Sequence, residues 1–353
     1  MRVLLGLVVL AIFTLACAQD APQDYLNRPD GDIAEKADEL WDLTFFIAVV
    51  VFFLVEGLLV FTIFRFRAKP GREARQFHGN TKVEIILTAI PAVILAGIAV
   101  PTIRTITETA EEPPNSLRVE LVAHRFWWEY RYEEEGFVTA NELHIPTNRD
   151  VILSMESDLI DPVTGQDGVV HSFWPPRLAG KQDVIPGRTT LLRLRADEAD
   201  TYLGQCGEFC GLGHAYMRLQ VIAHPQDEYE EWVSDQLAAA EEPGGGSAAE
   251  GAKLFAEGAE NGQFENGPAC SSCHALDPAL TEEGLAPQPA AGPNLAHFAS
   301  RKTFAGALLE NNTENLQRWL ESPPLVKPGA TMPDLGLTDE QIQDLIAYLQ
   351  SLE

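Results

Sequence analysis

Basic residues are scarce in this chain of 353 residues. It contains 25 Lys and Arg against 52 Asp and Glu, which gives a formal net charge of −27. Binding to nucleic acid needs clustered Lys and Arg to neutralise phosphates, so we expect no nucleic-acid partner. An acidic surface suits either a basic protein partner or simple solubility, and the composition favours neither explanation over the other.

Cysteine and histidine are also rare, with five cysteines and eight histidines in the whole chain. Cys17 stands alone, whereas Cys206 and Cys210 form one close pair and Cys270 and Cys273 another. Close pairs in an exported protein are commonly disulfides. Here each pair is followed closely by a histidine, and that pattern favours metal chemistry.

The chain begins with an apolar run that is too short for an ordinary membrane-spanning helix. One arginine precedes the run, which ends in small residues, so we predict a signal peptide over residues 1–17. Cys17 follows Leu15 and Ala16, which loosely resembles a bacterial lipoprotein cleavage site, although Thr14 stands where an aliphatic residue is usual. Lipidation of Cys17 and removal of the signal peptide both stay open.

Two longer apolar runs follow, over residues 43–64 and 83–103. The first has 22 residues, and at about 1.5 Å per residue it reaches roughly 33 Å, enough to cross a bilayer. Residues 65–82 between the runs carry six Lys and Arg but one acid, Glu73, and loops rich in Lys and Arg stay in the cytoplasm. We therefore predict a transmembrane helical hairpin over residues 40–104, with everything after it outside the cytoplasm.

Glu56 and Glu84 are the ionisable groups at or within these two runs. Carboxylates are costly in lipid, so both are functional candidates. We expect Glu56 to face a helix of another subunit. Glu84 lies near the cytoplasmic boundary, where a solvated interfacial carboxylate is the alternative explanation.

Residues 116–225 have a different pattern, with short runs rich in β-branched and aromatic residues between Pro, Gly, Asp and Asn. This pattern predicts an antiparallel sandwich or barrel. Near its end the segment CGEFCGLGHAYM, residues 206–217, places two thiols, an imidazole and a thioether within twelve positions. Soft sulfur ligands together with imidazole favour copper over magnesium or calcium.

The number of cysteines indicates which kind of copper site to expect. A single blue copper needs one cysteine, whereas two cysteines can bridge two copper ions. Such a pair would have two terminal imidazoles and two weak axial ligands, a thioether and a backbone carbonyl. The six residues in these roles are His171, Cys206, the carbonyl of Glu208, Cys210, His214 and Met217. A structural zinc site and a disulfide are the alternatives, but zinc leaves Met217 and Glu208 unexplained.

The C-terminal part has helical spacing after a flexible, Gly-rich linker over residues 241–249. We predict a small all-α domain over residues 250–353, with Thr338 as the N-cap of its last helix. Cys270, Cys273 and His274 form the CSSCH motif that attaches c-type haem, and zinc or a redox dithiol is the alternative. The segments GAKLF, GPNL and GATMP make this domain resemble class I cytochrome c.

Two residues compete for the sixth position on the haem iron. The resemblance to class I cytochrome c favours Met332, and a His/Met pair raises the haem potential. His297 is the competitor, but it follows GPNL closely.

The preceding part of the chain, from about residue 40 to 225, resembles cytochrome c oxidase subunit II. The segments that carry this resemblance in order and spacing are VEIILTAIPAVIL within 78–95, AHRFWWEYRY at 123–132, HSFWPPRLAGKQDVIPGR at 171–188 and the cysteine loop. The resemblance implies a multidomain chain with a two-helix transmembrane hairpin, an all-β cupredoxin-like Greek-key barrel and an all-α cytochrome c domain. It also implies that the six residues above bind a dinuclear copper centre, Cu-A.

The resemblance assigns two further carboxylates. The side chain of Glu208 matches one that reaches a magnesium ion at the junction with subunit I, and Glu84 matches one at the mouth of a proton pathway. Phe126 departs from the family, which usually has a tryptophan there that is linked to electron entry; Trp127 and Trp128 follow directly and are the candidate substitutes. Leu87 also replaces a common tryptophan, and residues 158–168 resemble a short insertion before His171.

The expected function is an electron relay in the plasma membrane of a bacterium, with the copper and haem domains on its outer side. A donor (cytochrome c, another small redox protein or a bc complex) reduces the haem. The linker lets the haem domain approach the copper domain. Electrons then reach Cu-A and subunit I, where oxygen is reduced and protons are pumped. Subunits I and III are the expected partners.

Three rival functions have different requirements. A membrane-tethered electron carrier without an oxidase would not need Glu56, Glu84 and Glu208 in these places. Nitrous oxide reductase shares the copper pair but lacks this hairpin and needs a second, histidine-rich copper site, for which eight histidines are too few. A quinol oxidase subunit has lost the copper ligands, all of which are present here.

Overall fold

The computed structural model describes residues 28–71, 78–238, 243–259 and 263–353. The predicted signal peptide and Cys17 lie outside these residues. The chain divides into two compact units, one formed by residues 35–111 and the other by the flanking segments. Each unit is described by itself.

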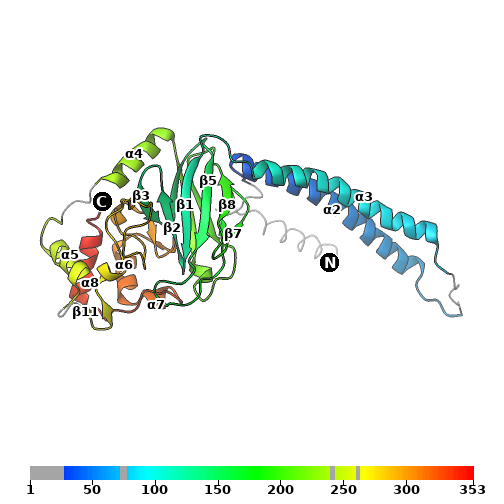
Figure 1. The fold of residues 1–353 in the computed structure, drawn as a ribbon. Helices are drawn as coiled ribbons and strands as arrows, with labels where there is room; N and C mark the ends of the chain where they lie inside the picture. Colours follow the sequence, from blue (N-terminus) through cyan, green and yellow to red (C-terminus); the bar gives the residue numbers. More distant parts are fainter. Residues whose placement is uncertain (1–27, 72–77, 239–242, 260–262) are drawn as a thin grey trace, which may run out of the picture. The chain divides into compact units, whose positions relative to one another are not determined.

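The first unit is a helical hairpin (Figure 1). Its helices are α2 (Gly31–Arg65), which begins just before the unit, and α3 (Thr81–Thr109). Both are long and apolar enough to cross a membrane, and their large apolar side chains are exposed. The side chain of Asn80 caps α3 by accepting hydrogen bonds from the backbone N–H groups of Lys82 and Val83. Glu84 therefore lies in the first turn of α3, as its place in the sequence predicted.

The second unit contains a β-barrel made of two five-stranded sheets. One sheet has the order β3-β2-β1-β5-β8 and the other β4-β10-β9-β6-β7. The strands are β1 (Leu117–His124), β2 (Trp127–Tyr132), β3 (Phe137–Ala140), β4 (Glu142–Pro146), β5 (Val151–Ser157), β6 (His171–Trp174), β7 (Gln182–Val184), β8 (Thr190–Leu194), β9 (Thr201–Cys206) and β10 (Arg218–His224). Apolar side chains from both sheets form the core, including the fully buried Trp128, Tyr130 and Phe173.

The expectation of purely antiparallel sheets is wrong for two pairs of strands. β1 pairs with β5, and β4 with β10, in parallel. A parallel pair needs a long crossover between its strands rather than a hairpin. Here β2, β3 and β4 separate β1 from β5, and the strands from β5 to β9 separate β4 from β10, so the alternation pattern of one strand could not reveal the direction of its neighbour.

A helix that the sequence analysis did not predict follows the barrel. α4 (Gln226–Leu237) packs on it through Tyr229 and Trp232. The Trp232 ring stacks on His144 with 4.1 Å between ring centroids and also contacts Tyr132. Tyr229, Trp232 and Val233 have the i, i+3, i+4 spacing of an apolar helix face, and this is the signal that would have found it.

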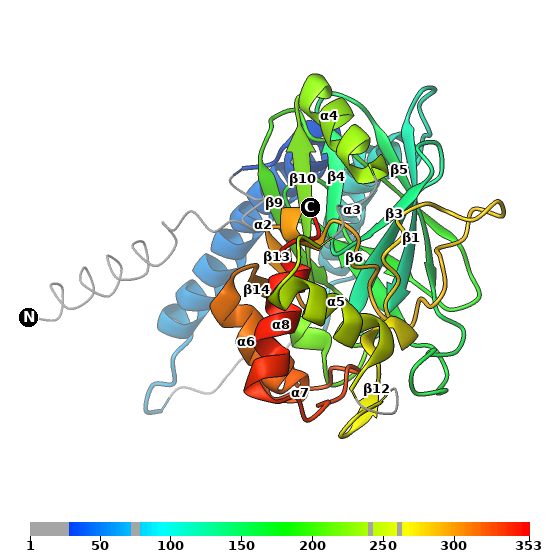
Figure 2. The same ribbon diagram turned by 90° about the vertical axis from the view of Figure 1, so that its left-hand side faces the viewer.

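The C-terminal domain is built mainly of short helices, as predicted. They are α5 (Ser247–Glu257), α6 (Thr313–Glu321), α7 (Pro323–Val326) and α8 (Asp339–Leu349). Figure 2 shows α5 and α8 side by side, and they make the most extensive helix pair of the domain. Thr338 caps α8 in a reciprocal bond with Gln341, which confirms the predicted N-cap. α5 begins at Ser247, inside the stretch predicted as linker.

Short turns and two small β-ribbons complete the fold. The 3-10 turns are η1 (His214–Tyr216), η3 (Cys270–Ser272) and η4 (Phe298–Ser300). The ribbons pair β11 (Gln263–Phe264) with β12 (Gly267–Pro268) and β13 (Thr303–Phe304) with β14 (Leu309–Glu310).

The C-terminal domain packs directly on the barrel, and the two belong to one compact unit. The buried Glu142 carboxylate of β4 accepts hydrogen bonds of 2.7 Å from the backbone N–H and from the hydroxyl of Thr303. The backbone N–H of Arg218 in β10 donates to the carbonyl of Gly306 at 3.1 Å. The domain is therefore held against the barrel by buried contacts, whereas the linker composition had suggested a tether that lets it approach.

Candidate metal centre and cofactor cavity

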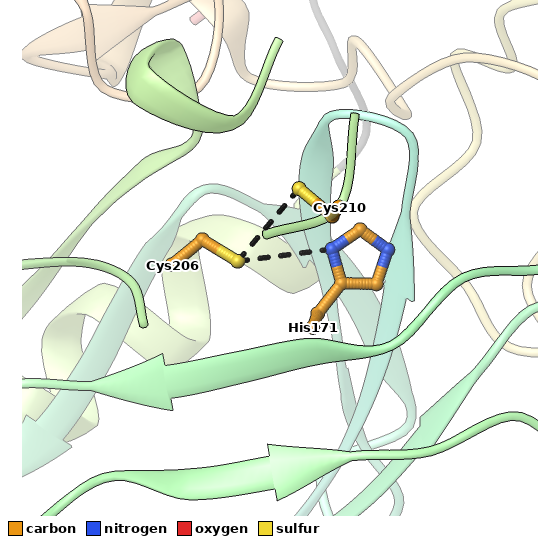
Figure 3. A group of neighbouring side chains, drawn as sticks. All are labelled: His171, Cys206 and Cys210. Atoms are coloured by element: carbon orange, nitrogen blue, oxygen red, sulfur yellow. Dashed lines mark hydrogen bonds between the residues drawn. The ribbon is translucent and has the colours of Figure 1, made fainter. Parts of the chain in front are cut away.

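Two cysteines and a histidine form a buried cluster at one end of the barrel (Figure 3). Cys206 ends β9 and His171 begins β6, which pairs with β9 in the same sheet. Cys210 comes from the loop after β9, and its sulfur lies beside that of Cys206. The two Sγ atoms are 3.8 Å apart, and Nδ1 of His171 lies 3.9 Å from Sγ of Cys206.

The other three predicted ligands surround this cluster. Nδ1 of His214 lies 3.8 Å from Sγ of Cys210, and Sδ of the buried Met217 lies 4.0 Å from the same sulfur. The backbone carbonyl oxygen of Glu208 lies 3.2 Å from Sγ of Cys206. The structure thus brings together all six residues singled out by the sequence. The Glu208 carboxylate pairs with Lys181 at 3.8 Å.

These distances fit a metal site better than a disulfide. A disulfide joins sulfurs at about 2.05 Å, whereas these cysteines are free thiols. Atoms that bind one metal at about 2.0–2.3 Å lie roughly 3.5–4 Å from one another, which is the spacing found here. Thiolate, thioether and imidazole donors are typical of copper, and carboxylates play no part in the cluster.

The pKa values of the two thiols depend on each other. The hydrogen bond between them is the largest cause of both pKa shifts: it lowers the pKa of Cys206 to about 3 and raises the pKa of Cys210. Two thiolates this close repel each other, so the pair shares one proton. A cation that replaces that proton would relieve the repulsion.

Trp128, one of the three candidate aromatics, lies inside the barrel. It is fully buried, and its ring meets the ring of His171 edge to face at 5.9 Å and that of Phe173 at 5.4 Å. Trp128 therefore packs against a predicted metal ligand, and it has no solvent-exposed surface for a docked donor.

Phe126 and Trp127 lie on the side of the barrel that faces the C-terminal domain. A Cβ atom at Gly213 would fall 2.3 Å from the Phe126 ring, so the cysteine loop contacts this ring only because residue 213 is glycine. The Trp127 ring stacks on His124 with 4.1 Å between centroids. Both aromatics also line a large cavity between the two domains. Phe126 thus lies between the cysteine loop and this cavity.

The cavity has a mainly apolar lining, and its empty space of about 1210 Å³ includes a part that is open to solvent. Cys270, Cys273, His274 and Met332, the four residues predicted to hold haem, all line it. Arg125 and Arg301 are among its polar lining residues and suit a cofactor that carries carboxylates.

His274 is held by its first ring nitrogen. Nδ1 lies 2.7 Å from the carbonyl oxygen of Pro293, so it donates a proton there and leaves Nε2 as the nitrogen with a lone pair. Burial is the largest cause that lowers the pKa of His274, and this keeps the ring neutral. A neutral imidazole with a fixed tautomer is the form that binds iron.

Met332 and His297 occupy different places. Met332 lines the cavity. His297 is 3% exposed at the start of η4, and within the described part of the chain it is not one of the residues that line the cavity. Of the two candidates, Met332 is therefore the one that lines the same cavity as His274.

Two buried groups near the site were missed at the level of sequence. His124 lies 2.8 Å from the carboxylate of Asp158, at the start of the predicted insertion. Lys327 donates hydrogen bonds to Phe126 and Ala305. His124 lies within the segment 123–132 that carries the resemblance, but neither residue belongs to a ligand-spacing motif, and only the packing of distant segments puts these groups at the site.

Comparison with known proteins gives the family. The model of the transmembrane domain of cytochrome c oxidase subunit II matches residues 23–105, that of its periplasmic domain residues 117–224, and that of cytochrome c residues 248–353. Cytochrome c oxidase subunit 2 of Alkalihalophilus pseudofirmus is 35% identical over 99% of this chain and 96% of its own length. The chain belongs to the cytochrome c oxidase subunit II family.

Other subunit II proteins are similar along the whole chain. Cytochrome c oxidase subunit 2 of Bacillus subtilis (strain 168) is 30% identical over 100% of this chain and 98% of its own length. Among solved structures, the periplasmic domain of subunit II of cytochrome oxidase of Bradyrhizobium japonicum is 24% identical, with a TM-score of 0.31, and covers 35% of this chain and 94% of that one. This subunit II chain is part of an oxidoreductase complex, a haem–copper oxidase, and carries a cytochrome c domain.

Proposed function

We propose that this subunit II accepts electrons at a covalently bound haem c and passes them through a dinuclear Cu-A centre to subunit I, where oxygen is reduced to water and protons are pumped. The observation that carries the proposal is that Phe126 borders both sites. Within one compact unit its ring contacts the cysteine loop at Gly211 and Gly213, and it also lines the cavity that contains the CSSCH motif (the haem-motif cavity).

The copper centre would be held by His171, Cys206, Cys210 and His214, with Met217 and the carbonyl of Glu208 at longer range. When bound, the copper pair supplies a one-electron acceptor whose charge is shared between two ions. The chain supplies a buried, preorganised cage, since five of the six ligands lie within the loop of residues 206–217 and the sixth lies on the neighbouring strand. A cage that does not rearrange suits fast electron transfer.

The haem would be held by Cys270, Cys273, His274 and Met332, the two cysteines forming its covalent attachment and the other two residues supplying donor atoms to the iron. When bound, it supplies an iron whose potential the His/Met pair raises. The apolar lining of the cavity would limit the access of water to the bound cofactor. The net acidic charge of the chain suits a basic donor, such as a cytochrome c, another small redox protein or a bc complex, because opposite charges speed the encounter.

The hairpin would anchor the chain in the bacterial plasma membrane as a two-span protein with the copper and haem domains outside. The basic residues 65–82 would remain in the cytoplasm. In this orientation the Glu84 carboxylate, in the first turn of α3, lies at the cytoplasmic end of the span and would take up protons for subunit I. The Glu208 carboxylate would contribute to a magnesium site at the junction with subunit I, and subunit III would complete the complex.

Purification of the tagged full chain from a host that makes the complete oxidase tests the proposal. We expect a large polytopic subunit to co-purify and the complex to consume oxygen with a reduced donor. Cys206→Ser should abolish oxygen consumption but retain the large subunit, whereas Gln205→Ala, on the exposed neighbour in β9, should keep both. A chain that purifies without the large subunit and still exchanges electrons with soluble donors would instead be a membrane-tethered carrier.

A further inference from the structure

Lys327 is a buried lysine at the boundary between the barrel and the C-terminal domain. Lys327 directly follows α7 and is 4% exposed. Nζ donates hydrogen bonds to the carbonyl oxygen of Phe126 at 2.7 Å and to that of Ala305 at 2.9 Å. A buried amine is costly unless its hydrogen bonds are made, and here those bonds join one carbonyl from each domain.

The segments around Lys327 hold the same stretch of the barrel. Gly306, next to Ala305, accepts a hydrogen bond from the backbone N–H of Arg218, which directly follows the predicted ligand Met217. Thr331, next to the predicted haem ligand Met332, lies 3.4 Å from the carbonyl oxygen of Arg125. One bond thus ties the neighbour of a predicted haem ligand to the residue before Phe126, and the other ties the neighbour of a predicted copper ligand to the residue after Ala305.

Phe126 is the residue that these bonds fix in place. Its ring fills the space beside Gly211 and Gly213 in the cysteine loop and also lines the haem-motif cavity. Lys327 lines the same cavity. A shift of the Phe126 backbone would therefore alter the spacing between the cavity and the cysteine loop.

We infer that Lys327 is a positioning residue for electron transfer: by binding the carbonyls of Phe126 and Ala305 it locks the cytochrome c domain onto the barrel and fixes the distance between the two redox centres. The inference rests on the proposed function for its redox part. In this arrangement the cytochrome c domain is docked in a single position, whereas the linker composition had suggested a tethered domain that moves towards the copper. Because the rate of electron transfer falls steeply with distance, a small loss of docking should have a large effect on the rate.

The test compares Lys327→Met with wild type in the full chain loaded with haem and copper. Methionine keeps the length of the side chain but loses the donor. The haem is reduced by a light-activated reductant, and the electron transfer from haem to copper is followed optically. We expect the rate within the chain to fall at least tenfold, while the haem and copper spectra and the rate of haem reduction from outside stay unchanged. Lys302→Met is the matched control, because Lys302 is exposed at the same interface and bonds Glu142 through its backbone.

A second readout does not depend on either cofactor. Amide hydrogen exchange of Arg218 and Thr303, whose N–H groups bond across the interface, should speed up at least tenfold in Lys327→Met and not in Lys302→Met. This readout separates the two proposals. If the wild-type chain transfers no electron to copper, the proposed function fails. Faster amide exchange in Lys327→Met would still support the docking role.

Two results would overturn the inference: an unchanged internal transfer rate in Lys327→Met, or unchanged exchange at both amides. If Lys327→Met does not fold, Gly306→Ala takes its place. A Cβ there would fall 2.7 Å from Nζ of Lys327 and 3.2 Å from the Phe126 carbonyl oxygen, and φ at Gly306 is +78°, so alanine displaces the amine and strains the backbone beside it. It should slow the internal transfer in the same way, and a normal rate in a folded Gly306→Ala would count against the role.

Discussion

The charge of His124 gives a pH dependence whose size and sign follow from the structure. Its Nδ1 lies 2.8 Å from Asp158, and its Nε2 lies 3.7 Å from Glu129, which is too far for a hydrogen bond but close enough for Coulombic attraction. Burial, the largest influence, favours the neutral ring, but the two carboxylates together outweigh it and raise the pKa of His124 to about 9. We therefore expect His124 to be a histidinium at neutral pH, stacked on the Trp127 ring.

The stability that this histidinium contributes depends on pH in one direction. The difference between an unfolded pKa of about 6.5 and a folded pKa of about 9 corresponds to about 3 kcal/mol. Because the folded pKa is the higher one, the whole contribution is present below about pH 6.5. It is lost as the pH rises through about 9.

Urea unfolding of the full chain in detergent, followed by tryptophan fluorescence, measures this contribution. Between pH 6 and pH 9.5 the wild type should lose about 3 kcal/mol more unfolding free energy than His124→Gln. His224→Gln is the matched control, because the pKa of His224 is lowered to about 4 and its effect on stability falls mainly below about pH 6.5. Equal pH dependence in the wild type and His124→Gln, or an imidazole that titrates near its ordinary pKa, would refute the reasoning.

Three further predictions concern the haem ligands and a second histidine. Met332→Ala should keep the covalent haem but lower its reduction potential in a redox titration; if His297→Ala has this effect instead, the assignment of the sixth ligand is wrong. Gly292→Ala places a Cβ 2.5 Å from the His274 ring, so the optical spectrum of the haem should show a disturbed axial ligand, and a normal spectrum would contradict the packing. Burial lowers the pKa of His224 to about 4, so the wild type should lose stability relative to His224→Gln as the pH falls from about 6.5 to 4; urea midpoints that move in parallel over this range would contradict it.

The arrangement of local elements could be predicted because each has a local cause. The apolar runs around Glu56 and Pro91 indicated the two long helices, and the spacing of Cys206, Cys210 and His214 indicated a tight loop around a metal. Each of these signals lies within a run of at most 22 neighbouring residues. Periodicity and ligand spacing act at that range, so sequence alone was enough to find them.

The relation between the domains could not be predicted, because it depends on contacts between distant residues. Lys327 and Phe126 are 201 positions apart, and neither has a local pattern that points to the other. The direction of β1 relative to β5 likewise depends on how the chain crosses the barrel. The Gly-rich stretch before α5 indicated flexibility, but buried contacts such as Glu142 with Thr303 determine where the domain lies.

The most direct test of the account is metal analysis and electron paramagnetic resonance of the purified full chain after haem maturation and copper loading. We predict two copper ions and one covalent haem per chain, with the mixed-valence signal in which one unpaired electron is shared by both coppers. Cys210→Ser should lose that signal and keep the haem. One zinc in place of the copper, or a single-copper signal, would contradict the account and leave a membrane-anchored cytochrome c.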